Sequence, residues 1–176
     1  MAENEQQGQE AQGNSQPQTA RFNVQRVYVK DSSFEAPESP ESFRKPYNPQ
    51  VNFNINNSSK HIEDNLYEVV LRLTADVKQD DKTIFLAEVH QGGIFDIAGI
   101  EGEQLEQVLT ITCPNVLFPY GREALDSLVI KGSFPALMLA PINFEAIYQQ
   151  AKLQQQKQAE EGAQPQAQQV PEGDSH

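Results

Sequence analysis

The residues of this chain that could catalyse a reaction are few and form no recognisable catalytic pattern. His61 stands close to Glu63 and Asp64, a spacing that would allow an acid–base pair. These residues fall in a polar stretch expected between two strands, and a solvated loop accounts for them better. No HExxH, GxSxG, P-loop or GxGxxG pattern occurs, and Gly92-Gly93 lacks the following Lys and Ser/Thr of a phosphate-binding loop. We predict no catalytic residue and no cofactor.

Metal and thiol chemistry are equally unsupported. Cys113 is the single cysteine, so no intrachain disulfide and no cysteine-based zinc site can form within one chain. Without a cationic neighbour in sequence, Cys113 is expected to be a plain buried thiol. The three histidines are scattered along the chain. We therefore predict no metal site.

The charge balance narrows the possible partners. The chain has 13 Lys and Arg against 25 Asp and Glu, for a formal net charge of -12. This acidity argues against nucleic acid and against an anionic membrane surface. No apolar run is long enough to span a bilayer, and no signal-peptide pattern opens the sequence. We expect a cytoplasmic protein without membrane insertion, whose partner docks through basic residues.

The length of 176 residues allows one domain. Residues 1–20 and 154–176 are rich in glutamine, and such segments bury too little surface to offset the entropy of ordering. We predict two disordered tails around a folded domain at 21–153. The tails are either inert termini or acidic, solubilising extensions.

Apolar residues with a period of two predict four strands, near 21–30, 51–56, 66–77 and 83–91. The first changes phase between Val24 and Val27, which predicts a bulge. The last is expected to end in a sharp turn at Gly92-Gly93 and to continue as a compact apolar loop. Since no helix separates the strands, they should form an antiparallel sheet.

Between the first two predicted strands, four prolines from Pro37 to Pro49 exclude helix and central strand, and predict a surface loop. The aromatic residues Phe34, Phe43 and Tyr47 either plug the core from this loop or form the wall of a binding groove.

Helices should follow the strands. Helical spacing predicts one helix over 103–112, an interruption at Pro114 and a second helix over 120–131. Asn143 is a suitable cap for a final helix. Strands first and helices afterwards define an α+β domain.

Two apolar or mixed surfaces remain unexplained by this fold. Leu86 and Glu88 share one face of a strand, and Asp31 and Glu35 lie at a strand–loop junction. Together they would suit a basic, partly apolar docking segment, although ordinary solvent-exposed surface explains them too. Two or three helices also leave one face of the sheet to be covered by a second subunit or by a bound client.

Several blocks in the sequence closely resemble the SecB family of bacterial protein-export chaperones, over residues 22–151. The blocks are DSSFEAP, YNPQVNFNI, LYEVVLRLT, FLAEVHQGGIF, CPNVLFPYGRE and LAPINF. The resemblance implies a homotetramer, built as a dimer of dimers, that holds unfolded preproteins in apolar grooves and passes them to the motor SecA. It places SecA-binding residues at Asp31, Glu35, Leu86 and Glu88. It places client-binding residues at Tyr47, Val51, Phe53, Ile55, Phe144, Ile147 and Tyr148.

Three positions depart from the family pattern: Tyr47 replaces a familiar tryptophan, Ala87 a cysteine and Gly121 an alanine. Three alternatives stay open. One is a SecB-like chaperone serving a toxin–antitoxin system, the second is a small α+β enzyme such as an acyl-group hydratase, and the third is a structural oligomer without a client. Mixing the protein with an unfolded polypeptide would separate a chaperone from the last two.

Overall fold

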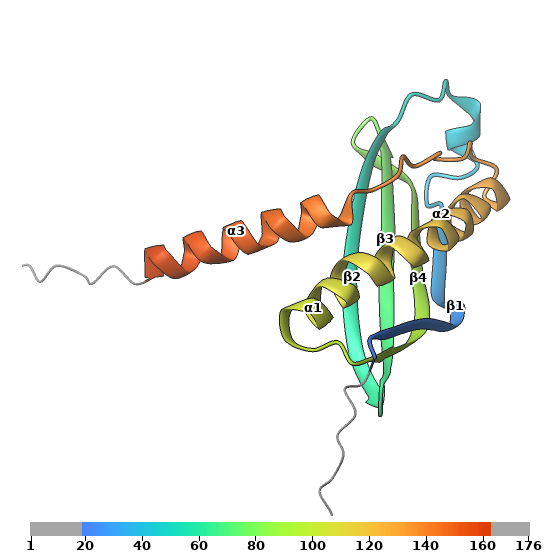
Figure 1. Cartoon of the computed structure of the whole chain (residues 1–176). Helices are drawn as coiled ribbons and strands as arrows, with labels where there is room; N and C mark the ends of the chain where they lie inside the picture. The colour runs from blue at the N-terminus through green and yellow to red at the C-terminus, as the bar shows by residue number, and fades with distance from the viewer. Residues whose placement is uncertain (1–18, 163–176) are drawn as a thin grey trace, which may run out of the picture.

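The computed structural model describes residues 19–162 of the chain, with side chains to residue 158. Four antiparallel strands form one sheet in the order β1-β4-β3-β2 (Figure 1). Their bounds are β1 (Arg21–Glu35), β2 (Gln50–Glu63), β3 (Leu66–Gln79) and β4 (Lys82–Ala98). The predicted antiparallel sheet followed by helices is confirmed. Register shifts in β1 between Val24 and Arg26 and between Val29 and Asp31 confirm the predicted bulge and add a second one.

The sharp turn predicted at Gly92-Gly93 is wrong, because β4 continues through both glycines to Ala98. The glycines serve close packing instead. A Cβ atom at Gly92 would lie 2.6 Å from the Tyr28 ring, and one at Gly93 would lie 2.7 Å from the Phe95 ring and 2.8 Å from Leu117. A missing side chain therefore lets two neighbouring groups approach the strand.

β2 is also longer than its apolar alternation predicted. It pairs with β3 from Gln50 to Glu63, so the strand runs past the end predicted near residue 56 and turns at residues 64–65. Polar residues at the end of β2 face solvent, so hydrophobic alternation gives no signal for this part of the strand.

The interruption predicted at Pro114 is wrong as well. α1 (Gly102–Gln107) continues through a π-helical turn at Val108–Thr112 into α2 (Cys113–Lys131). Pro114 is the second residue of α2, just after the π turn that ends at Thr112. The regular i→i−4 bonding is already broken there, so the missing N–H of Pro114 is tolerated. Pro119 lies inside α2, and buried side chains on either side of it hold the helix against the sheet.

The core lies between α2 and the two central strands, and α1 and α2 cross one face of the sheet (Figure 1). The inward side chains of β3 and β4 are completely buried there: Val69, Leu71, Leu73, Ala75, Val77, Phe85, Ala87, Val89 and Phe95. The same sequence alternation sends the intervening residues of these strands to the other face of the sheet. None of the helices in residues 19–162 covers that face (Figure 1).

The last helix, α3 (Phe144–Gly162), projects away from the sheet (Figure 1). The Asn143 side chain accepts a hydrogen bond from the backbone N–H of Ala146 at 3.0 Å, which confirms the predicted cap. α3 runs past the domain end predicted at residue 153, because its Gln, Ala, Lys and Glu residues favour helix without burial. The rest of that tail, 163–176, and residues 1–18 lie outside the described residues.

Gly93 on β4 and Gly121 on α2, which both lie where the helix meets the sheet, provide a test of this packing. We expect Gly93→Ala to lower the free energy of unfolding by about 1–3 kcal/mol, because the new methyl group overlaps Phe95 and Leu117. Gly121→Ala is the matched variant. Its nearest contact is a Leu73 methyl group at 2.9 Å, and alanine gains about 1 kcal/mol of helix propensity, so stability should stay within about 1 kcal/mol of the parent. Urea unfolding that showed Gly93→Ala to be as stable as the parent would contradict the packing.

Candidate functional sites

The groups considered for catalysis are placed by the structure in plain surroundings. His61 lies at the exposed end of β2, where its Nε2 is 2.9 Å from the carbonyl oxygen of Asp64 and its ring packs edge-on to Tyr67. Cys113 is completely buried, and burial raises the pKa of its thiol to about 12. Both observations agree with structural roles. Among residues 19–158, no three His, Cys, Asp or Glu side chains gather as metal ligands would.

The four residues predicted for docking come together on the open face of the sheet. In the β1–β4 register, Asp31 pairs with His90 and Glu35 pairs with Leu86. Glu88 lies between those positions, opposite Ser33, and shares its face with Leu86. We call Asp31, Glu35, Leu86 and Glu88 the acidic patch.

Glu88 is the best-held member of the acidic patch. One carboxylate oxygen accepts a hydrogen bond from the Thr74 hydroxyl at 2.9 Å, and the other accepts one from Arg72 Nη2 at 2.9 Å. His90 Nε2 lies 2.9 Å from the same oxygen as Arg72. Burial acts to raise the pKa of the Glu88 carboxyl, but the bonds from Thr74, His90 and Arg72 outweigh it and lower the pKa below its usual value. Glu88 is therefore ionised at neutral pH.

Arg72, Thr74 and His90 were missed when the site was predicted from the sequence. Arg72 pairs with His90 and Thr74 pairs with Glu88 in the β3–β4 register. The signal that could have found them is the hairpin turn at residues 80–81, because its position determines which β3 residue lies opposite each β4 residue.

Four of the predicted client-binding residues line one hollow beside α3, with a volume of about 180 Å³. They are Ile55, Phe144, Ile147 and Tyr148. We call this cavity the α3 hollow. Phe144 and Tyr148 are nearly buried and form its wall, whereas Ile147 is 44% exposed. Asn57, Leu71 and Thr110 also line it and were not predicted.

The other predicted client residues lie on or near β2, the edge strand that carries Ile55. Val51 is 47% exposed, and Phe53 and Ile55 are partly buried against the core. Val51, Phe53 and Ile55 alternate with outward-facing asparagines, as predicted, so all three share the helix-bearing face of β2. We call these three residues with Tyr47 the apolar strip.

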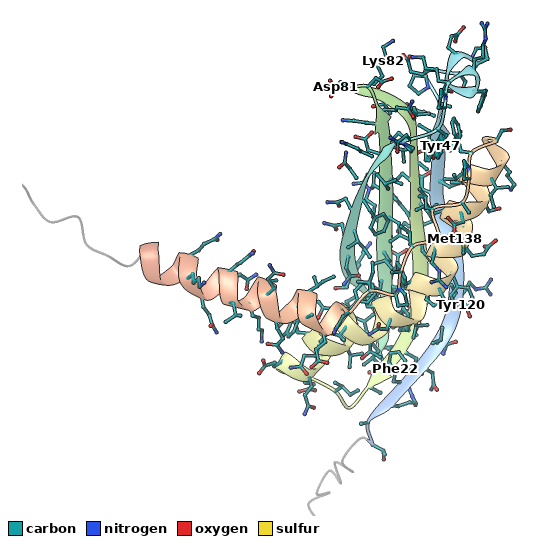
Figure 2. All side chains as sticks on the ribbon, turned by 90° about the horizontal axis from the view of Figure 1, so that it is seen from above. Phe22, Tyr47, Asp81, Lys82, Tyr120 and Met138 are labelled. Carbon is teal, nitrogen blue, oxygen red and sulfur yellow. The ribbon has the colours of Figure 1, made fainter. Side chains whose placement is uncertain are left out.

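Tyr47 lies at the end of the sheet away from the point where α3 leaves the body (Figure 2). The Gln79 side chain bonds to the backbone on both sides of it, at 3.0 and 2.9 Å. The Tyr47 ring packs near the Phe134 ring, at 6.4 Å between centroids. Phe43 also packs on the Phe134 ring, at 5.0 Å. Phe34 packs on Phe85 at 5.7 Å and plugs the core, while Tyr47 and Phe43 keep exposed edges. Phe34 therefore plugs the core, whereas a binding-groove role for Tyr47 and Phe43 stays a prediction.

With this geometry in place, comparison with known proteins decides the family. A family model described as preprotein translocase subunit SecB matches residues 14–156. The chain belongs to the SecB family. Proteins named protein-export protein SecB are similar to it over most of their length. The one from Marinobacter nauticus is 54% identical over 159 residues, covering 90% of this chain and 94% of the relative. The one from Stutzerimonas stutzeri is 53% identical over 143 residues, covering 81% and 87%.

A solved structure also matches the fold of this SecB-family chain. It is the SecB-like chaperone Rv1957 of Mycobacterium tuberculosis, in complex with a peptide from the HigA1 antitoxin, with a TM-score of 0.59 and 16% identity. The match covers 69% of this chain and 91% of that one. At this identity the likeness shows the fold alone.

The family assigns the chain to the protein-export chaperones. It is not a family of enzymes, so the acyl-group hydratase alternative is not supported. No helix within residues 19–162 is both long and apolar enough to cross a membrane.

Proposed function

We propose that this SecB-family protein holds unfolded preproteins on the apolar strip and in the α3 hollow, and delivers them to SecA through the acidic patch, in the cytoplasm. One observation carries the proposal: the two surfaces lie on opposite faces of one sheet. The apolar strip is on the face that bears α2, and the acidic patch is on the open face. A client and a docking partner therefore have separate places to bind.

The client surface suits an unfolded chain because it offers apolar area without a deep, shape-specific pocket. Tyr47 and Val51 keep more than two-fifths of their surface exposed, as does Ile147 at the mouth of the α3 hollow. Unfolded polypeptides expose apolar side chains that folded proteins bury, so such a surface binds the unfolded state preferentially. This supports a holding function.

The acidic patch suits a basic, partly apolar segment of SecA. Asp31 and Glu35 are exposed, and Leu86 provides an apolar point between acids. Charges of this kind mainly raise the association rate and set orientation, and salt weakens their effect.

We propose that the protein is a homotetramer built as a dimer of dimers, because two further apolar surfaces are exposed. β1 is an edge strand with exposed Val24 and Val29. The second surface lies on the outer side of α2, where Ile130 and Met138 are 58% and 79% exposed beside a cleft. Tyr120 and Met138 lie on this α2 side of the molecule (Figure 2). Two separate surfaces allow two kinds of interface, as a dimer of dimers needs.

For assembly, we expect light scattering to give four times the chain mass of 19.7 kDa at micromolar concentration. The double variant Ile130→Asp with Met138→Asp should give twice the chain mass, because it places charges in only one of the two interfaces. A monomer mass for the parent would contradict the proposal. A tetramer mass for the double variant would show that α2 is not an interface.

For client binding, we expect Val51→Asp and Ile147→Asp each to weaken binding of an unfolded preprotein by about tenfold, since a charge enters apolar surface. Leu153→Asp is the matched control: Leu153 is also on α3 and 57% exposed, but it does not line the α3 hollow. Delay of client refolding is the measurement. If Leu153→Asp impaired it as much as Ile147→Asp did, binding would not depend on the α3 hollow.

For docking, we expect the double variant Asp31→Lys with Glu88→Lys to weaken SecA binding at least tenfold, about 1.4 kcal/mol. A single exposed ion pair contributes only about 0–1 kcal/mol, so two reversals are the stronger test. Client holding and oligomer mass should stay unchanged, because both residues lie on the open face of the sheet, whereas Val24 and Val29 of β1 lie on the helix-bearing face with the client surface. Calorimetric titration with SecA at low salt provides the measurement. Unaltered affinity would remove the acidic patch as the docking surface.

A further inference from the structure

The acids of the acidic patch are not equally available to a partner. The Asp31 side chain is 67% exposed, and its nearest basic group is His90 Nδ1 at 4.0 Å. Glu35 is exposed, and within residues 19–158 no basic side chain forms an ion pair with it. Glu88 differs from both, because its side chain is only 22% exposed and already pairs with Arg72. A partner that approaches Glu88 meets the chain's own cation first.

The two oxygens of Glu88 have different partners. Thr74, directly opposite on β3, donates its hydroxyl hydrogen bond to one oxygen, so the orientation of the carboxylate does not depend on Arg72. The other oxygen accepts a hydrogen bond from Arg72 Nη2, and Arg72 Nε lies 2.9 Å from His90 Nε2. The Arg72 side chain is 52% exposed. An exposed pair of this kind is weak, so an incoming cation can displace it.

We propose that Arg72 is a specificity-determining residue of the acidic patch, an internal competitor that a docking partner must displace from Glu88. The inference rests on the proposed docking of SecA to this patch. It also specifies the chemistry of the docking segment. An arginine side chain would replace Arg72 best, since its planar fork matches a carboxylate better than an ammonium group does.

An apolar side chain next to that arginine would reach Leu86, which is two residues from Glu88 along β4 and so about 7 Å away. A further basic group would meet Asp31 or Glu35, which have no comparable partner among residues 19–158. A basic segment without the apolar residue would gain less binding free energy to offset the displacement of Arg72. Arg72 therefore favours a segment that carries the arginine, the apolar residue and the further basic group together.

The test is Arg72→Gln, which removes the competing charge and keeps a polar side chain. We expect SecA to bind this variant about threefold to fivefold more tightly at low salt, since one weak competing pair is lost. The affinity should also fall more steeply with salt, because the patch is more negative. Arg72→Lys keeps the competing charge and should leave the affinity within about twofold of the parent.

Lys60→Gln is the matched control for net charge. Lys60 lies on the same open face, opposite Glu68 and six positions along β3 from Thr74, which is about 20 Å. The gain of Lys60→Gln is compared with that of Arg72→Gln at physiological salt, where the screening length is about 8 Å, so the control variant should change SecA affinity there by less than about twofold. Unchanged melting of all three variants shows that each is folded.

The outcomes separate the inference from the proposed function. Weaker or equal SecA binding by Arg72→Gln would overturn the competitor role, as would an equal gain in Lys60→Gln or in Arg72→Lys. If Asp31→Lys with Glu88→Lys still loses SecA in the same experiment, the docking surface stands while the role of Arg72 fails. If that double variant binds SecA normally, the docking surface fails and the inference about Arg72 fails with it.

Discussion

Close contact between α2 and the two central strands determines which face of the sheet is buried and which stays open. Gly93 on β4 lets Leu117 approach the strand, and Gly121 on α2 lies against Leu73 and Gln91 of the sheet. The inward residues of β3 and β4 are completely buried as a result. Apolar burial of this extent is the dominant stabilising contribution in a domain of this size. The proposed binding surfaces are arranged around this contact.

The placement of α2 also separates apolar from acidic chemistry. On the helix-bearing face, the apolar strip and the α3 hollow continue the core to the edge of β2, where part of the apolar surface reaches solvent. On the open face, alternation places Glu88 and Leu86 next to the edge strand that carries Asp31 and Glu35. Because successive side chains of a strand point to opposite faces, one sheet can present both kinds of surface without either disturbing the other.

Local patterns predicted the sheet well. Val51, Phe53 and Ile55 were assigned to one face because a half-buried antiparallel strand has a period of two, and the structure agrees. Gly92 and Gly93 were misread as a turn, since the reason for them lies in Tyr28 and Leu117, which are distant in sequence. Pro114 was misread as a break because the π turn before it has no clear sequence pattern.

In the candidate sites too, local sequence predicted some residues, whereas others depend on contacts between distant parts of the chain. The residues of the acidic patch could be named from short sequence blocks, and the register brings them together on one face. Arg72 could not be named in this way, because its hydrogen bond to Glu88 depends on the exact pairing of β3 with β4. The continuation of α3 beyond residue 153 was missed for a different reason: burial was used to predict order, whereas helix propensity extends this segment.

Client and SecA are proposed to bind to separate faces of one sheet. The most direct measurement is the affinity of SecA for the protein with and without a saturating unfolded polypeptide that does not itself bind SecA. Separate surfaces predict a coupling factor near one, with the two affinities within about twofold, and a complex that contains all three components. Mutual displacement, with SecA binding weakened about tenfold or more by the client, would show that the two binding sites overlap.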